Sequence, residues 1–151
     1  MRTILTTVVA LGLLCFIAPN GWAQRGTPDP ERLAVQQVIL SMAQNIQAGQ
    51  LGAVDTLFAP RGHILTDTMT LHAWSEYRDG QLKSELARFT GIRFEHTAVE
   101  AQVRGTVAWV AFRQQISGAT SAGPLQLSGR GTAVLEKRDA RWVIVHLHVS
   151  R

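Results

Sequence analysis

The sequence predicts an α+β fold in which about three N-terminal helices pack against a cone-shaped, curved antiparallel sheet. Three observations support this prediction. A helical apolar stripe follows Pro30, the pattern changes from helix-like to strand-like after Gly91, and four long strand-like segments then complete the chain. Helices followed by a meander of strands are typical of α+β domains, whereas doubly wound folds alternate strand and helix. A bent sheet covered on one side leaves a mouth at which small molecules can bind.

The first helix is predicted to begin at Pro30 and to end near Gly49. Asp29 is a suitable N-cap residue, and proline is favoured at the first helical position. One apolar stripe follows at helical spacing, formed by Val35, Val38, Ile39, Met42 and Ile46. A glycine such as Gly49 commonly follows the end of a helix.

Two more helices and a short strand are expected before the sheet. A short helix around Val54 is ended by Pro60, and residues 63–67 form a strand candidate. A third helix is indicated by apolar side chains at Trp74, Tyr77, Leu82, Leu86 and Phe89. Gly80 weakens the middle of this helix by about 1 kcal/mol relative to alanine.

Four strands are predicted after Gly91, separated by turns rich in glycine, serine and aspartate. They are Arg93–Val103, Thr106–Ile116, Leu125–Glu136 and Arg141–Val149. In the last strand neither face is suited to water, because successive side chains point to opposite faces. One face would carry Val143, Val145, Leu147 and Val149, and the other would carry Trp142, Ile144, His146 and His148. We therefore predict a homodimer through the sheet, with the valine-and-leucine face as its interface.

The N-terminus reads as an export signal. Residues 4–18 are apolar except for two threonines and a glycine, and a small-residue pair suited to cleavage stands at Gly21 and Ala23. Since about 20 apolar residues are needed to span a bilayer, we interpret residues 1–23 as a cleaved signal peptide. An uncleaved membrane anchor is the alternative.

The exported protein would be periplasmic or secreted and would not associate with a membrane after cleavage. It would consist of a polar leader, residues 24–29, and one domain, residues 30–150. The single cysteine of the chain, Cys15, would leave with the signal, which excludes disulfides, cysteine nucleophiles and cysteine-ligated metals. The 15 Lys and Arg are mostly scattered singly and are opposed by 11 Asp and Glu, so we expect no nucleic-acid partner.

Several segments resemble one known family. The motif W-x-I-V-H-x-H-x-S at residues 142–150 is similar to the closing strand of SnoaL-like domains, within the nuclear transport factor 2-like or ketosteroid isomerase-like superfamily. The glycine turn at Gly105, the Ala-Trp pair at 108–109 and residues 130–137 resemble the family in the same order. The same closing motif looks like that of the association domain of calcium/calmodulin-dependent protein kinase II. The resemblance implies a cystatin-like fold over roughly residues 30–150, and it does not fix an activity.

The resemblance also suggests a catalytic acid–base pair. In ketosteroid isomerase-like enzymes, a carboxylate near the end of the first strand removes a proton next to a carbonyl, and Asp67 falls close to that place. Tyr77 would donate a hydrogen bond to the substrate oxygen. Asp67 reads equally well as a turn residue among threonines.

Five residues are candidate ligand contacts: Trp74, Tyr77, Arg130, His146 and His148. Trp74 and Tyr77 lie one helical turn apart and could form an aromatic lip, or simply core. Arg130, if it faces the cone, needs an anionic partner, which is either a protein carboxylate or a carboxylate ligand. The spacing of His146 and His148 occurs in metal sites, with His63, His72 or His96 as a third ligand, but a hydrogen-bonded wall is the preferred interpretation. We expect no metal and no cofactor.

Three functions remain open. The preferred one is an exported domain that binds a small, apolar or carbonyl-containing molecule in the cone. The second is a cofactor-independent isomerase or dehydratase, a lyase, with Asp67 as the base and Tyr77 or His146 as the donor. The third is a non-catalytic dimerisation or assembly module.

Overall fold

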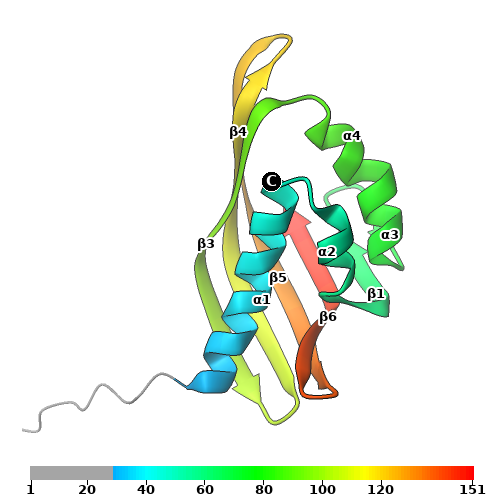
Figure 1. Ribbon diagram of the computed structural model, residues 1–151, viewed down its shortest axis with the longest axis vertical. Coiled ribbons are helices and arrows are strands. Elements are labelled where there is room, and N and C mark those ends of the chain that lie inside the picture. The colour runs from blue at the N-terminus through cyan, green and yellow to red at the C-terminus, as the bar shows by residue number, and fades with distance from the viewer. Residues whose placement is uncertain (1–28) are drawn as a thin grey trace, which may run out of the picture.

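The computed structural model describes residues 29–151, which form one six-stranded sheet with helices on one face (Figure 1). The helical segments are α1 (Pro30–Gln47), α2 (Leu51–Asp55), α3 (Trp74–Glu76), the π-helix η1 (Tyr77–Leu82) and α4 (Lys83–Leu86). The strands are β1 (Phe58–Leu65), β2 (Thr70–Leu71), β3 (Thr90–Arg104), β4 (Val107–Thr120), β5 (Gly123–Arg138) and β6 (Arg141–Ser150). The predicted signal peptide and nearly all of the leader lie outside the described residues. Within residues 29–151, no helix is both long and apolar enough to cross a membrane.

The strands lie in the order β2-β1-β6-β5-β4-β3. From β3 to β6 they form the antiparallel meander that the sequence predicts. The first strand differs, because β1 pairs with β6 in parallel, so the sheet is mixed rather than wholly antiparallel. Figure 1 shows α1 and α2 in front of the sheet, with α3 and α4 beside them near β1. The prediction of an α+β fold with helices on one face of a curved sheet is confirmed.

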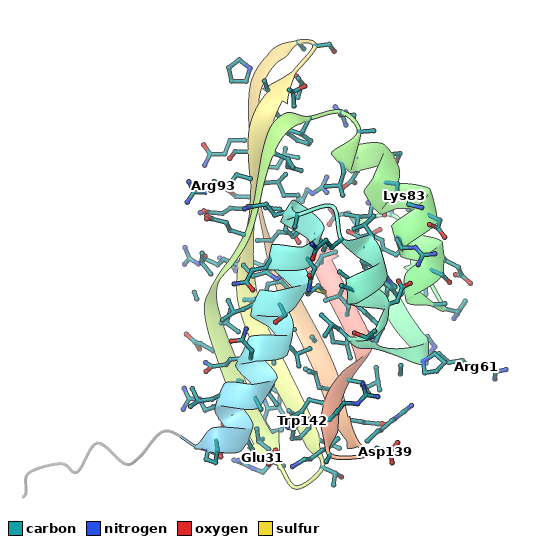
Figure 2. All side chains as sticks on the ribbon, in the orientation of Figure 1. Glu31, Arg61, Lys83, Arg93, Asp139 and Trp142 are labelled. Atoms are coloured by element: carbon teal, nitrogen blue, oxygen red, sulfur yellow. The ribbon has the colours of Figure 1, made fainter. Side chains whose placement is uncertain are left out.

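Helix α1 begins and packs as predicted. The Asp29 side chain accepts a hydrogen bond from the Glu31 N–H, and Pro30 occupies the first helical position. The buried stripe is Val35, Ile39, Met42, Ala43 and Ile46. Glu31 also ties the helix start to the sheet, because its carboxylate accepts from Lys137 Nζ at 2.5 Å and from Trp142 Nε1 at 2.8 Å (Figure 2). These two hydrogen bonds, that of Lys137 first, lower the pKa of Glu31.

Two elements before the sheet differ from prediction. Strand β1 begins at Phe58 rather than His63, and Pro60 lies inside it. Pairing of β1 with β6 is interrupted between Phe58 and His63, and proline is tolerated where no ladder N–H is needed. The third predicted helix is divided into α3, η1 and α4, with the π-helical turn around Gly80, where the helix is intrinsically weak.

A β-bulge in β6 overturns the predicted faces of that strand. Leu135 of β5 pairs with Ile144, but Val134 pairs with His146, so Val145 is an extra residue without its own partner. The extra residue shifts the alternation by one position. The inner face of β6 therefore carries Trp142, Ile144, Leu147 and Val149, all in the core.

The predicted dimer face is corrected by the same bulge. Leu147 is 1% exposed and Val149 is 9% exposed within a single chain, so neither is available to a second copy. His146 and His148 consequently lie on the outer face, away from the helices, rather than with Trp142 and Ile144. The bulge thus separates both histidines from the cone.

Candidate functional site

The inner face of the sheet, which meets α1, carries one polar pair in an otherwise apolar surface. Along β4 buried and exposed side chains alternate, and Gln114 stands in the buried register between Phe112 and Ile116. Its partner across the β3–β4 ladder is His96. Among residues 29–151, His96 and Gln114 are the buried polar side chains, at 5% and 6% exposure.

Hydrogen bonds define the state of His96. Its Nδ1 lies 3.0 Å from the carbonyl oxygen of Ile39 in α1, and its Nε2 lies 3.3 Å from Oε1 of the Gln114 amide. Because a carbonyl oxygen only accepts, Nδ1 must carry a proton. Burial lowers the pKa of His96, against the opposing effect of its hydrogen bonds, so the ring is neutral at pH 7 and Nε2 accepts. Because an unprotonated Nε2 only accepts, we assign the Gln114 amide in the flipped orientation, with NH₂ toward Nε2, which leaves the amide oxygen free to face elsewhere.

Two grooves lie near this polar pair, one on the inner face of the sheet beside α1 and one formed mainly by outer-face residues. The first, between α1 and β3, has a volume of about 250 Å³ and includes His96 in its lining. The second, which we call the β6-end groove, has a volume of about 420 Å³ and is lined by Arg113, Gln114, Gln115, Ser128, Gly129, Arg130, Ser150 and Arg151. Ligand pockets usually occupy about 300–1,000 Å³, so the second groove lies within this range and the first lies just below it.

Trp74 and Tyr77 lie in the core rather than at an open lip. The Trp74 indole stacks on Phe58 with ring centres 4.7 Å apart, and its Nε1 donates to Asp55 at 2.6 Å. Tyr77 is 5% exposed. Burial, followed by the charge of Glu85, raises the pKa of Tyr77 to about 12. The phenol is therefore protonated at neutral pH and can donate a hydrogen bond.

A polar cluster that the sequence did not reveal lies beside Tyr77. Gln81 donates to Glu85 through Nε2 at 2.9 Å, and the other oxygen of Glu85 pairs with the Arg151 guanidinium. The Gln81 amide oxygen is buried without a hydrogen-bond partner among residues 29–151. Since Arg151 also lines the β6-end groove, the cluster continues from that groove toward Tyr77. Gln81 is a candidate site residue because its buried side-chain oxygen accepts no hydrogen bond within residues 29–151.

Asp67 stands outside this cluster in an exposed turn after β1. Its carboxylate oxygens accept from the backbone N–H of Arg151, at 3.2 and 3.3 Å. Asp67 is exposed to solvent, so the apolar walls that surround a buried catalytic base are missing around it. The geometry of Asp67 matches the turn-capping interpretation.

The remaining candidate contacts face away from the helices. Arg130 is exposed and lines the β6-end groove, directly opposite Arg113 on β4. His148 is exposed, and His146 is half-buried. Burial lowers the pKa of His146, with further contributions from His63 and His148.

His146 belongs to a separate hollow on the outer face. This hollow has a volume of about 830 Å³, and it also includes His63 of β1 and His72. The rings of His63 and His72 pack edge to face with centres 5.5 Å apart. Within residues 29–151, no group of three His, Cys, Asp or Glu side chains is arranged to hold a metal ion.

Comparison with known proteins identifies the family. The sequence matches the SnoaL-like domain over residues 35–151, so the chain belongs to the SnoaL-like family. None of the curated proteins matches this sequence. The resemblance seen in the closing strand is therefore confirmed over nearly the whole described chain.

Solved structures with the same fold come from the wider nuclear transport factor 2-like superfamily. A protein of unknown function from Mycobacterium tuberculosis is 22% identical, with a TM-score of 0.69 over 79% of this chain and 70% of that one. A candidate ketosteroid isomerase from Shewanella frigidimarina is 21% identical, with a TM-score of 0.66 over 76% and 92%. The association domain of CaMKII from C. elegans is 16% identical, with a TM-score of 0.67 over 80% and 95%. Identities this low show a common fold.

Proposed function

We propose that this SnoaL-like domain binds a small carbonyl-containing molecule at the His96–Gln114 pair, entering through the groove between α1 and β3. One observation carries the proposal, namely a buried polar pair on an apolar inner face, with His96 in the lining of that groove. A neutral His96 ring occupies the NH₂ end of the Gln114 amide, so the amide oxygen is available to a ligand donor. Tyr77 and Gln81 supply further polar contacts on the helix side.

Binding is favoured over the isomerase alternative because of where the two proposed catalytic residues lie. Tyr77 is a protonated donor, as that mechanism needs. Asp67, the proposed base, is exposed and holds a backbone N–H. A proton-abstracting base at that position would lack the desolvation that tunes such groups.

The substitution Gln114→Leu is expected to abolish binding of small aromatic carbonyl compounds, because it removes the amide of the polar pair and keeps a side chain of similar size. The probes are acetophenone and benzamide, measured by saturation-transfer NMR and by thermal unfolding, in which a ligand of the native state raises Tm. Gln115→Leu is the matched control, since Gln115 is the next residue, faces the opposite side of the sheet and lies outside the groove between α1 and β3. Equal losses in the two variants, or binding retained in Gln114→Leu, would contradict the proposal.

We also propose that two copies of the domain associate through the outer face of the sheet. Trp109 of β4 is 46% exposed and Val107 is 41% exposed, on the face opposite the helices. Exposed large apolar side chains on one face are typical of interaction surfaces. CaMKII association domains share the fold, which is consistent with self-assembly. We also propose that the protein is exported from the cytoplasm, because residues 1–23 have the pattern of a cleaved signal peptide.

Trp109→Lys is expected to convert the dimer to monomers, because it replaces the largest exposed apolar side chain of the outer face with a charged one. The mass in solution, from light scattering at several concentrations, measures this. Leu33→Lys is the control, since Leu33 is 51% exposed but lies on α1. A mass that is unchanged by Trp109→Lys, or lowered equally by Leu33→Lys, would rule out this interface.

A further inference from the structure

The groove between α1 and β3 contains a side-chain amide whose orientation is fixed. Gln47, the last residue of α1, lines this groove together with Phe94 of β3. The Gln47 Oε1 accepts a hydrogen bond from the Phe94 N–H at 2.9 Å. Because a backbone N–H only donates, the end of the amide that faces Phe94 must be the oxygen. Both N–H groups of the Gln47 NH₂ therefore remain for other acceptors.

Helix α1 is attached to β3 along the length of this groove. Gln36 donates to the carbonyl oxygen of Val99 at 2.7 Å, and His96 forms its hydrogen bond to the helix backbone further along. The bond between Gln47 and β3 is the third attachment, at the Phe94 end. A ligand therefore meets an amide that is already held in place, which reduces the entropy cost of binding.

The lining of the groove offers no cation to an anionic ligand. Among the described residues that form it there is neither lysine nor arginine, and the His96 ring is neutral. Its one carboxylate, that of Glu95, already accepts a hydrogen bond from Arg93 at 2.8 Å. A carboxylate ligand would lose hydration in this groove without gaining an ion pair. The groove therefore favours a neutral ligand.

The remaining groups define what a neutral ligand must offer. The Gln47 NH₂ requires an acceptor, and Leu40 and Ala43 add apolar contact beside it. We propose that Gln47 selects the ligand, by donating a hydrogen bond from its NH₂ to the carbonyl oxygen of a neutral ketone or amide, and that the groove rejects carboxylic acids. This inference rests on the proposed function, because it concerns the same groove, and it adds a specificity-determining residue and the class of ligand.

Gln47→Glu tests this assignment, because it keeps the shape of the side chain and the acceptor for the Phe94 N–H but replaces the NH₂ with a second acceptor oxygen. The probes are acetophenone, benzoate and the cation benzamidine, measured by NMR titration of the full chain. The unmodified protein is expected to bind acetophenone at least about tenfold more tightly than benzoate. In Gln47→Glu the affinity for acetophenone is expected to fall at least about tenfold, and that for benzamidine to rise at least about tenfold.

Gln37→Glu is the matched control. It makes the same change of charge on the same helix, but Gln37 is exposed, donates to Ser41 and lies outside the groove. We expect it to change each affinity by less than about twofold, since exposed charges at this distance are screened. The gain of benzamidine binding also shows that the Gln47→Glu variant is folded.

The outcomes separate this inference from the proposed function. Acetophenone binding that is lost in Gln114→Leu but kept in Gln47→Glu would overturn the role of Gln47 and leave the proposed function standing. Equal losses in Gln47→Glu and Gln37→Glu would overturn it as well, as would a loss of acetophenone without a gain of benzamidine. If benzoate binds the unmodified protein as tightly as acetophenone, the neutral class of ligand is wrong. If acetophenone does not bind the unmodified protein, both proposals fail.

Discussion

Gly131→Ala is expected to destabilise the folded protein by about 1–3 kcal/mol, although alanine normally favours a strand more than glycine does. Gly131 lies on the inner face of β5, directly opposite Phe112 of β4. A Cβ atom at Gly131 would lie 2.1 Å from Cζ of the Phe112 ring. That ring is buried and packs on His96 with ring centres 4.3 Å apart, so it cannot move without disturbing the polar pair. Urea denaturation measures the change in the free energy of unfolding.

A control and a compensating change make this prediction specific. Gly52→Ala in α2 places a methyl group where no atom lies within 4 Å, so it should stabilise the protein by about 0.5–1 kcal/mol. Phe112→Leu removes the far end of the ring that the new methyl group meets. The double variant should therefore lose less stability than the two single variants together, by about 0.5–3 kcal/mol. Additive losses would show that Gly131 is constrained by something other than Phe112.

The features that could be predicted from sequence are those set by neighbouring residues. Asp29 and Pro30 mark the start of α1 because capping and a fixed φ act within one turn. The apolar stripe of α1 and the four strands after Gly91 follow from their own periodicity. The prediction that the first strand begins after Pro60 was wrong. Strand β1 accommodates Pro60 because its pairing with β6 is irregular there, and this pairing is a long-range property.

The faces of β6 could not be predicted for the same reason. Residues 142–149 alternate smoothly in sequence, and nothing local marks Val145 as a bulge. The bulge is defined only by the register with β5, where Val134 and Leu135 pair with His146 and Ile144. One extra residue moves His146 and His148 to the outer face, and with them the expected ligand contacts.

The candidate site could be predicted only in part from the sequence. Gln114 follows Val110 and Phe112 in the buried register of β4, so a polar residue in an apolar alternation was visible in the sequence. Its pairing with His96 was not, because it depends on how β3 and β4 align across 18 residues. The opposition of Arg113 and Arg130 likewise requires the β4–β5 register. The residue pattern singled out His96 and Arg130 but not Gln114, and the strand register brings the paired residues together.

Acidification from pH 7.5 to pH 5 is expected to destabilise the protein through His96. Burial lowers the pKa of His96 in the folded state, while an unfolded histidine titrates near 6.5. Below about pH 6.5 the unfolded chain therefore binds more protons than the folded one, so the free energy of unfolding falls as the pH falls. One such group contributes a slope of up to about 1.4 kcal/mol per pH unit, until the folded-state pKa is reached. Above about pH 6.5 its contribution is flat.

The slope, rather than the stability at one pH, distinguishes His96 from the other titrating groups. His96→Gln should remove most of it, because glutamine can still donate to the Ile39 carbonyl but does not titrate. The partly exposed His146 should contribute less than His96, since solvent screens it. The carboxylate of Glu31, whose pKa is lowered, titrates below this window. Urea denaturation in half-unit steps between pH 5 and 7.5 gives the slopes. If His96→Gln retains the slope of the unmodified protein, then His96 is not held neutral by burial, and the Gln114 oxygen is not free for a ligand.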